Sequence, residues 1–322
     1  MANQSGKEFN SLVLDVGNSD LKGYINGQFF CLPSSYVLSF GLDSLDLMGV
    51  KAPFDGFSVY DHNNNPEHKQ YKFAKLGGNR VLGDGDKLQM YKVIVQGCCG
   101  SRKSDKPWKV VISHWSRGKM GDMKKILKGT HVVTVNGVQS EFKIAEVVPV
   151  NEAAGADLLY RQKASGSLAV IDIGYNTLIY RQTSEAGVEH HSVFRNYGVR
   201  QIVMTIKDSN ALRALAGCTP DARAIIRAIQ NHGMLRSNQV EKPEVDISHI
   251  ISAAVRDWAS GPLGEVTKRF SSGIGQSSGI WLIGGGANLL RKYAEGTNIH
   301  VPEEPEYVNV RGMATLLNAN EK

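Results

Sequence analysis

The chain has 322 residues, 42% of them hydrophobic and 21% charged, which excludes a disordered polymer and indicates a folded globular protein. This length exceeds what one hydrophobic core usually supports, so we expect two domains. The net charge of +6 favours acidic partners only in a general way. No stretch approaches the roughly 18 apolar residues of a membrane-spanning helix, so we expect no membrane span.

The cysteines have no spacing typical of a zinc or dithiol redox site. Cys98 and Cys99 are adjacent, and a disulfide between neighbours would be strained. We therefore expect reduced thiols in a cytoplasmic protein, with Cys98-Cys99-Gly100 in a loop.

The chain opens with a predicted three-stranded meander. Ser11–Val16 is a run of strand formers, Gly17-Asn18-Ser19 interrupts it, and Leu21–Ile25 resumes it. Asn26-Gly27 is typical of a type I′ turn and leads into a third strand at Gln28.

Residues Val37–Tyr91 look irregular, and we expect a loop-rich subdomain there. We then predict a strand at Trp108–Trp115, a short helix at Gly118–Gly129 and a hairpin around Asn136-Gly137. The elements expected after this hairpin are a strand at Ala145–Val150 and a helix at Glu152–Gln162.

A second meander repeats the first after 157 positions, which is 172 minus 15. Asp15 and Asp172 each end a strand in an Asp-apolar-Gly sequence, and such self-similarity suggests duplicated domains. Helical patterns and a strand followed by three glycines complete the chain. The predicted segments are strands Leu168–Ile173, Thr177–Gln182, Val188–Phe194 and Gly279–Ile283, and helices Val199–Ala216, Pro220–His232, Ile247–Phe270 and Val310–Leu317.

These turns suit a bound nucleotide. Glycines at strand ends allow close approach of the backbone, and successive N–H groups form a nest for an anion. Ser19 and Thr177 add hydroxyl donors, Lys22 adds a charge, and the three glycines leave room for a nucleoside. The expected nucleotide contacts are Asp15, Gly17, Asn18, Ser19, Lys22, Gly174, Tyr175, Asn176, Thr177, Gly284, Gly285, Gly286 and Ala287.

Asp15 and Asp172 are the expected Mg²⁺ ligands, directly or through water, because Mg²⁺ takes few carboxylates and keeps several waters. The chain contains neither the glycine-rich P-loop sequence nor the dinucleotide fingerprint after its first strand. The sequence thus predicts a nucleotide site of another type.

The order of these motifs resembles the actin-like ATPase superfamily. Leu14–Gly23 is similar to its first phosphate motif, Val170–Thr177 to its second, and Ile280–Ala287 to its adenosine motif. Within it the chain is most similar to ParM/StbA-type plasmid-segregation actins, because of Lys22-Gly23 after the first turn and Asn309–Gly312 near the end.

This resemblance implies an α/β fold of two similar actin-like (RNase H-like) lobes, each with a mixed β-sheet flanked by helices, around a nucleotide cleft. We expect the first lobe at residues 1–160 plus 303–322 and the second at 161–302. The resemblance also implies ATP or GTP with Mg²⁺, self-assembly into dynamic filaments and a DNA-bound adaptor protein. No direct sequence-specific DNA binding and no membrane association are expected.

The resemblance places the catalytic polar residue at the start of the helix that follows the Ala145–Val150 strand. Glu152 is our candidate there, with Asn151 and Glu146 as alternatives, and Asp172 is the second catalytic candidate. Ile179 stands where many relatives carry an Asp, and Tyr175 where Gly is frequent. A small-molecule kinase of the sugar or acetate type and a non-hydrolysing nucleotide-gated module therefore stay open as alternatives.

Overall fold

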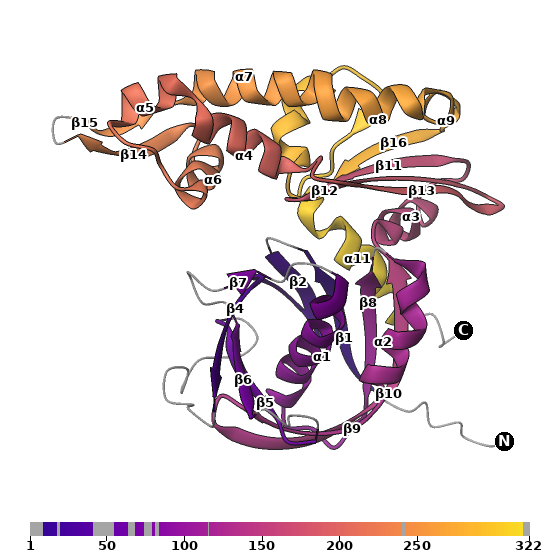
Figure 1. Cartoon of the computed structure of the whole chain (residues 1–322). Coiled ribbons are helices and arrows are strands. Elements are labelled where there is room, and N and C mark those ends of the chain that lie inside the picture. The colour runs from indigo at the N-terminus through magenta and orange to yellow at the C-terminus, as the bar shows by residue number, and fades with distance from the viewer. Residues whose placement is uncertain are drawn as a thin grey trace. The chain divides into compact units, whose positions relative to one another are not determined.

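The computed structural model describes residues 9–17, 20–40, 55–63, 68–73, 79–80, 84–114, 116–239 and 242–317. The chain forms two compact units (Figure 1). The first unit is Met1–Ala164 with Tyr307–Lys322, and the second unit is Ser165–Glu306. The lobe boundaries expected from the sequence, at 160 and 303, differ from the boundaries of these units by four residues each.

The first unit is built on a ten-stranded sheet in the order β3-β2-β1-β8-β10-β9-β5-β6-β4-β7. Strand β8 lies between β1 and β10 and runs parallel to both, whereas the other pairs are antiparallel. The strands are β1 (Asn10–Val16), β2 (Asp20–Ile25), β3 (Gln28–Pro33), β4 (Ser35–Phe40), β5 (Phe57–Asp61), β6 (Lys69–Phe73), β7 (Asn79–Arg80), β8 (Trp108–His114), β9 (Gly129–Val135) and β10 (Val138–Asn151).

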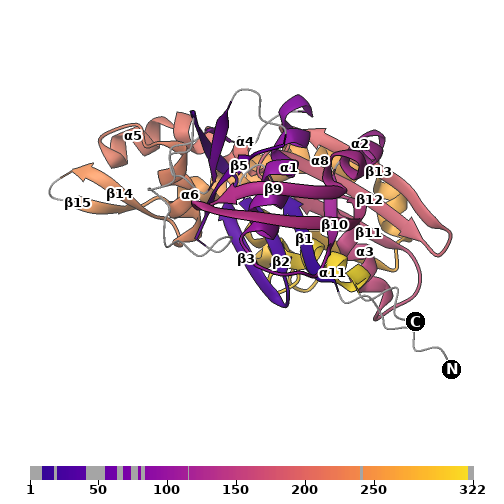
Figure 2. The same cartoon turned by 90° about the horizontal axis from the view of Figure 1, so that it is seen from below.

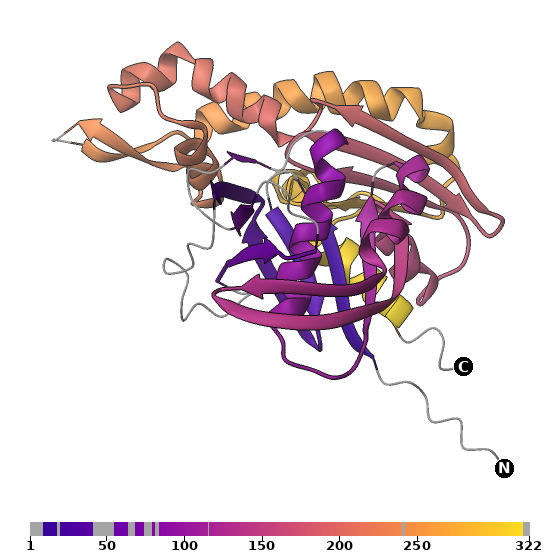
Figure 3. The same ribbon diagram turned by 60° about the horizontal axis from the view of Figure 1, so that its bottom comes forward.

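Helix α1 (Asp84–Gly100) forms the centre of this unit, because the sheet curls around it and β1, β5, β9 and β10 all contact it (Figure 1). The long β9–β10 hairpin, magenta in Figure 3, crosses one side of α1, and its turn is the predicted Asn136-Gly137 with positive φ at both residues. The remaining helices of the unit are α2 (Met120–Leu127), α3 (Ala154–Arg161) and α11 (Val308–Ala314).

The prediction of a loop-rich segment at Val37–Tyr91 is wrong over its described part. That part contains β5, β6, β7, most of β4 and the start of α1. Strands of two to six residues are too short to show a period, and they form here by pairing with each other and with β9.

The placement of Cys98 and Cys99 in a loop is wrong as well. Both lie in the last turn of α1 and have no exposed surface, and burial raises the pKa of both thiols. They stay protonated and unreactive, and all four cysteines of the chain are free.

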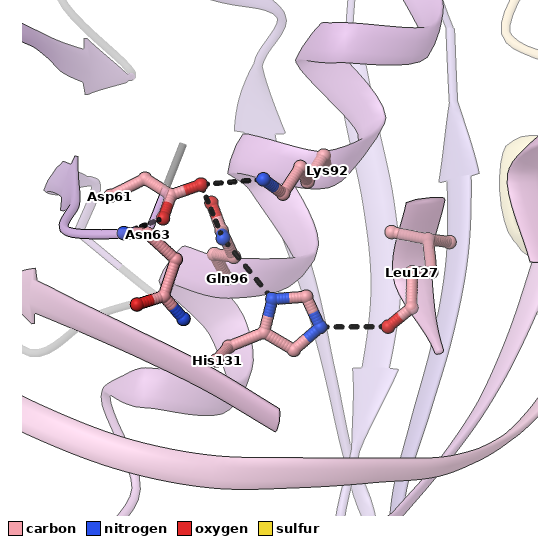
Figure 4. A network of polar contacts seen from close by, with 6 residues as sticks. All are labelled: Asp61, Asn63, Lys92, Gln96, Leu127 and His131. Atoms are coloured by element: carbon pink, nitrogen blue, oxygen red, sulfur yellow. Dashed lines mark hydrogen bonds and ion pairs between the residues drawn. The ribbon is translucent and has the colours of Figure 1, made fainter. Parts of the chain in front are cut away.

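A buried polar network joins three distant elements of the first unit (Figure 4). On α1, Lys92 Nζ lies 2.6 Å from Asp61 Oδ2 at the end of β5, and Gln96 Nε2 donates to the same oxygen at 2.9 Å. Gln96 also lies 3.2 Å from His131 Nδ1 on β9, and His131 Nε2 donates to the Leu127 carbonyl at 2.8 Å. A carbonyl only accepts, so Nε2 carries the proton and Nδ1 is the acceptor.

Burial lowers the pKa of His131, since the charged imidazolium loses water there. Burial by itself would raise the pKa of Asp61, but hydrogen bonds from Lys92 and Gln96 outweigh it and lower that pKa. The network thus holds a neutral histidine and a charged carboxylate that attach β5 and β9 to α1.

The second unit has a five-stranded sheet in the order β13-β12-β11-β16-β17, in which β11, β16 and β17 are parallel. A separate hairpin of β14 and β15, which the sequence did not predict, projects away from this sheet (Figures 1 and 2). The strands are β11 (Leu168–Ile173), β12 (Thr177–Ser184), β13 (Gly187–Arg195), β14 (Met234–Gln239), β15 (Lys242–Asp246), β16 (Gly279–Ile283) and β17 (Ile299–His300).

The helices of the second unit are shorter than the periodicity predicted. Ser209 ends α4 and caps α5 by accepting a hydrogen bond from the Leu212 N–H, and a π-helical turn containing Pro262 separates α7 from α8. No helix in the described part of the chain is both long and apolar enough to cross a membrane. The helices are α4 (Val199–Asp208), α5 (Asn210–Ala216), α6 (Ala222–Gln230), α7 (Ser248–Trp258), α8 (Gly264–Arg269), α9 (Ser271–Gln276) and α10 (Arg291–Ala294).

Candidate functional site

The two repeated hairpins have the same hydrogen-bonded geometry. In the first unit, the Gly17 N–H donates to the Asp20 carbonyl at 3.1 Å, and in the second unit Gly174 donates to Thr177 at 2.9 Å. Two residues separate the bonded pair in each hairpin. Tyr175 and Asn176 form the second loop, whereas Asn18 and Ser19, both expected to contact phosphate, lie outside the described residues.

The register also matches between the two units. Asp15 lies directly opposite Lys22 on the neighbouring strand, and Asp172 lies directly opposite Ile179. Opposite residues project from the same face of a sheet. The carboxylate therefore has a cationic neighbour in the first unit and a buried apolar one, 2% exposed, in the second.

The carboxylate of Asp15 is held from the adjacent strand. Because β1 and β8 are parallel and pair Leu14 with Ile112, Ser113 stands level with Asp15 at the carboxyl ends of both strands. The Ser113 hydroxyl donates to Asp15 Oδ1 at 2.6 Å. Sequence reasoning missed Ser113; the available signal was a polar Ser-His pair after the apolar run Val110–Ile112.

Glu152 lies beyond the end of β10 and is tied to the same strand β8. Its N–H donates to the His114 carbonyl at 3.1 Å, which extends the β8–β10 ladder by one bond. Ala153 follows in the left-handed region with φ of 64°, an unusual conformation for a residue with a Cβ, and α3 begins at Ala154. Asp15 and Glu152 are thus both attached to the end of β8.

Helix α3 is fixed at its first turn by α11. The Gly155 N–H donates to Asn309 Oδ1 at 2.9 Å, and Asn309 is only 3% exposed. A Cβ on Gly155 would lie 2.0 Å from the Asn309 carbonyl oxygen, so the glycine is what allows the two helices to approach. This contact sets where the segment after Glu152 can lie.

The alternative candidate Glu146 lies elsewhere. Glu146 pairs with Lys109 of β8, and Lys109 pairs with Ser11 of β1. Ser11 precedes Asp15 by four residues, so Glu146 lies about 13 Å from the level of Asp15 along the strand direction. Its carboxylate lies 3.6 Å from the Lys109 ammonium. The other alternative, Asn151, is the last residue of β10 and pairs with His114.

In the second unit, the glycine-rich turn lies against Asp172. Strands β11 and β16 are parallel and pair Asp172 with Ile283, so the turn follows directly beside the carboxylate. Gly284 has φ of +83°, and a Cβ there would lie 2.3 Å from Asp172 Oδ1. A Cβ on Gly286 would lie 2.3 Å from Ile173 Cγ2. Packing within the protein therefore requires both glycines.

Gly285 differs, because a Cβ there would meet no atom within 4 Å. Of the three glycines it is the one whose missing side chain leaves open space beside the turn. Ala287 is fully buried in the core of this unit, and its N–H donates to the Gly284 carbonyl at 3.1 Å.

Helix α4 covers the second turn. The Val199 N–H donates to the Gly174 carbonyl at 3.1 Å, and the Arg200 N–H donates to the Tyr175 carbonyl at 2.7 Å. The first backbone N–H groups of α4, which have no partner within the helix, therefore bind the carbonyls of this turn. The Tyr175 side chain is partly buried and packs against the hydrophobic core of the unit.

Each unit carries one strand-end carboxylate of the kind that Mg²⁺ uses in a metal–nucleotide complex, Asp15 in the first unit and Asp172 in the second. No group of three or more His, Cys, Asp or Glu side chains that could hold a metal ion occurs in the described ranges. Mg²⁺ in phosphate sites takes one or two carboxylates, with phosphate and water oxygens as the other ligands. The donor chemistry of each unit, taken by itself, therefore fits Mg²⁺.

No protein-family model matches the chain, and no characterised protein matches it in sequence. Solved structures match nearly all of it. A ParM filament from Clostridium botulinum has 16% identity and a TM-score of 0.74, covering 96% of this chain and 99% of that one. An archaeal actin homologue has 18% identity and a TM-score of 0.75, covering 96% and 98%.

The actin-like protein Alp7A is similar as well, with 14% identity, a TM-score of 0.70 and coverage of 98% of this chain and 97% of that one. These likenesses confirm the fold class that the motifs predicted, a mixed α/β architecture with two mixed sheets flanked by helices. The chain has the actin-like fold of ParM-type proteins.

Proposed function

We propose that the chain binds ATP with Mg²⁺, hydrolyses it and polymerises into dynamic filaments. The observation that carries this proposal is the pair of Asp-x-Gly hairpins, which share one hydrogen-bond pattern and one register in an actin-like fold. The archaeal actin homologue was solved in complex with ADP at a TM-score of 0.75 to this chain, and ParM and Alp12 were solved as filaments. GTP could replace ATP, because a glycine turn discriminates poorly between bases.

The phosphates and the Mg²⁺ are bound by three kinds of group in this proposal. The N–H groups of the turns at Gly17 and Gly174 would face phosphate oxygens, with the ammonium of Lys22 as a point charge. Bound Mg²⁺, held by Asp15 and Asp172, supplies positive charge to the phosphates. Further contacts would come from Asn18, Ser19, Tyr175, Asn176, Thr177, Gly284, Gly285, Gly286 and Ala287.

Glu152 would act on the attacking water. Its carboxylate can accept the water's proton or align the water by a hydrogen bond. Its fixed attachment to the end of β8 and the left-handed residue after it support this role, because a catalytic group needs a restrained position.

The biological role that we propose is plasmid segregation in the cytoplasm, with a DNA-bound adaptor protein linking the filament to its cargo. In this proposal the two actin-like lobes are residues 1–160 with 303–322 and residues 161–302.

The proposal is tested by light scattering of the purified protein after ATP and Mg²⁺ are added. We expect a rise above a sharp critical concentration and a decay as nucleotide is consumed. Asp172→Ala should show neither turnover nor the decay. No rise at high protein concentration would contradict polymerisation.

The nucleotide-gated module is kept as a second candidate because of one observation. Ile179 is buried directly opposite Asp172, where a second carboxylate is absent. Tight ATP binding with no release of phosphate by the wild-type protein would favour this candidate over the ATPase.

A further inference from the structure

The last two residues of β8 hydrogen-bond to Asp15 and to Glu152, the first through a carboxylate and the second through a backbone N–H. The Ser113 side chain donates to Asp15 Oδ1 at 2.6 Å, and the His114 carbonyl accepts from the Glu152 N–H at 3.1 Å. Ser113 has no exposed surface and His114 is 2% exposed. The strand end itself is therefore buried, whereas Asp15 and Glu152 are each partly exposed.

His114 is itself firmly placed. Its Nδ1 accepts a hydrogen bond from the Ser116 N–H at 2.9 Å, and its ring meets Tyr91 of α1 edge-on at 5.5 Å. The chain beyond β8 therefore bends back onto the histidine, and the strand end has little freedom to move. A rigid support of this kind is what a positioned catalytic group requires.

The Ser113 hydroxyl is not needed to complete the sheet. The three residues before it are buried and apolar, and the backbone of β8 is paired on both sides, with β1 and with β10. Alanine would satisfy the packing of such a position without a polar atom to bury. The function of the Ser113 hydroxyl is therefore its hydrogen bond to Asp15.

The partner is a carboxylate whose orientation matters. The terminal torsion of Asp is broad and is poorly restrained by rotamer preference alone. A short hydrogen bond to Oδ1 fixes the plane of the carboxylate, so that Oδ2 points in one direction. Supporting hydrogen bonds of this kind orient metal ligands, and their loss typically lowers metal affinity about 10-fold to 100-fold.

We propose that Ser113 is a positioning residue that orients the Asp15 carboxylate for Mg²⁺, while the adjoining His114 carbonyl holds Glu152 to the same strand. This inference rests on the proposed function, in which Asp15 serves Mg²⁺. It adds a residue that acts through Asp15 and touches neither nucleotide nor metal. It also explains the serine near the end of this strand, because only its hydroxyl side chain reaches Asp15.

The test compares Ser113→Ala, Ser113→Thr and a matched control, Ser58→Ala. Ser58 is a second buried serine of the same unit, 1% exposed on β5, and its hydroxyl lies 3.5 Å from Asn136 Oδ1. For each protein, binding of a fluorescent ADP analogue is titrated with Mg²⁺ present and again in EDTA. Urea unfolding is followed in parallel.

We expect Ser113→Ala to weaken binding about 10-fold to 100-fold with Mg²⁺ and to leave binding in EDTA unchanged. Ser113→Thr, which keeps the hydroxyl, should recover most of the loss, and Ser58→Ala should behave as wild type in both titrations. The inference would be overturned if Mg²⁺ strengthened binding of the analogue as much in Ser113→Ala as in the wild type. Equal losses with Mg²⁺ and in EDTA would also overturn it, because they would indicate a structural role.

The wild-type titration separates this inference from the proposed function. If wild-type protein bound the analogue no better with Mg²⁺ than in EDTA, the proposed Mg²⁺ site would fail and the role of Ser113 with it. If the wild type showed the Mg²⁺ effect and Ser113→Ala kept it, only the inference would fail.

Discussion

Gly284 lies against Asp172 so closely that a Cβ on the glycine would stand 2.3 Å from the Asp172 Oδ1. The glycine also has φ of +83°, so its conformation and its neighbour both exclude a side chain. The conformation of the glycine-rich turn is therefore coupled to the position of a proposed Mg²⁺ ligand. The structure therefore excludes a side chain at Gly284 and Gly286 but has room for one at Gly285, although the three glycines are equivalent in the sequence.

We predict unequal effects on stability for alanine at two neighbouring glycines. Gly284→Ala should lower the free energy of unfolding by roughly 2–4 kcal/mol, from backbone strain plus overpacking against Asp172. Gly285→Ala should change it by less than about 0.5 kcal/mol, because its Cβ meets no atom within 4 Å. Urea unfolding measures both, and ADP affinity should fall in the folded Gly285→Ala protein. Unchanged affinity in that variant would remove Gly285 from the nucleoside contacts.

Glu152→Gln should slow ATP hydrolysis about 100-fold to 10,000-fold and leave nucleotide affinity near that of wild type. Glutamine retains the shape and the hydrogen-bonding ends of the side chain but cannot take a proton from water. Phosphate release under single-turnover conditions measures the chemical step, and Glu146→Gln is the matched control. Undiminished phosphate release from Glu152→Gln would exclude the catalytic role.

Ala153→Gly tests whether the left-handed residue restrains Glu152. Glycine relieves the strain of φ at 64° but gives the unfolded chain more freedom, so the free energy of unfolding should change by less than about 1 kcal/mol. Hydrolysis should fall while ADP affinity is retained, because Glu152 gains freedom. His232→Gly, at another left-handed residue with φ of 53°, should leave hydrolysis unaltered. Equal hydrolysis by Ala153→Gly and wild type would speak against the restraint.

The buried histidine predicts acid sensitivity of the first unit. The pKa of His131 is lowered in the folded state, so the unfolded chain binds the proton first as the pH falls below about 6.5. Stability due to neutral His131 is present above that pH and is lost on acidification, at up to about 1.4 kcal/mol per pH unit. The lowered pKa of Asp61 adds a further loss only below about pH 4.

Urea unfolding of His131→Gln between pH 5 and 7.5 should therefore show a flatter stability profile than wild type. Glutamine can still donate to the Leu127 carbonyl but does not titrate. His62→Gln, at an exposed histidine of the same unit, is the matched control. If the stability of the His131→Gln protein depended on pH as that of the wild type does, His131 would not be the source of the acid sensitivity.

The resemblance carried by local motifs proved sufficient for the fold class. Asp-x-Gly at the ends of β1 and β11, the Asn136-Gly137 turn and the strand before Gly284 each depend on the φ and ψ preferences of a few consecutive residues. The first strands of both units could be placed for the same reason. The segment from Val37 to Tyr91 could not, because its short strands carry no period of their own.

What the amino-acid sequence determined by itself was this set of turns and meanders, and with them the expectation of two phosphate-binding hairpins. Only the tertiary structure decided which residues support them. Ser113 reaches Asp15 across 98 positions and Asn309 reaches Gly155 across 154, distances over which a single sequence has no local signal. The pairing of β1 with β8 and the packing of α3 on α11 create these contacts, because they bring together segments whose local preferences are independent of each other.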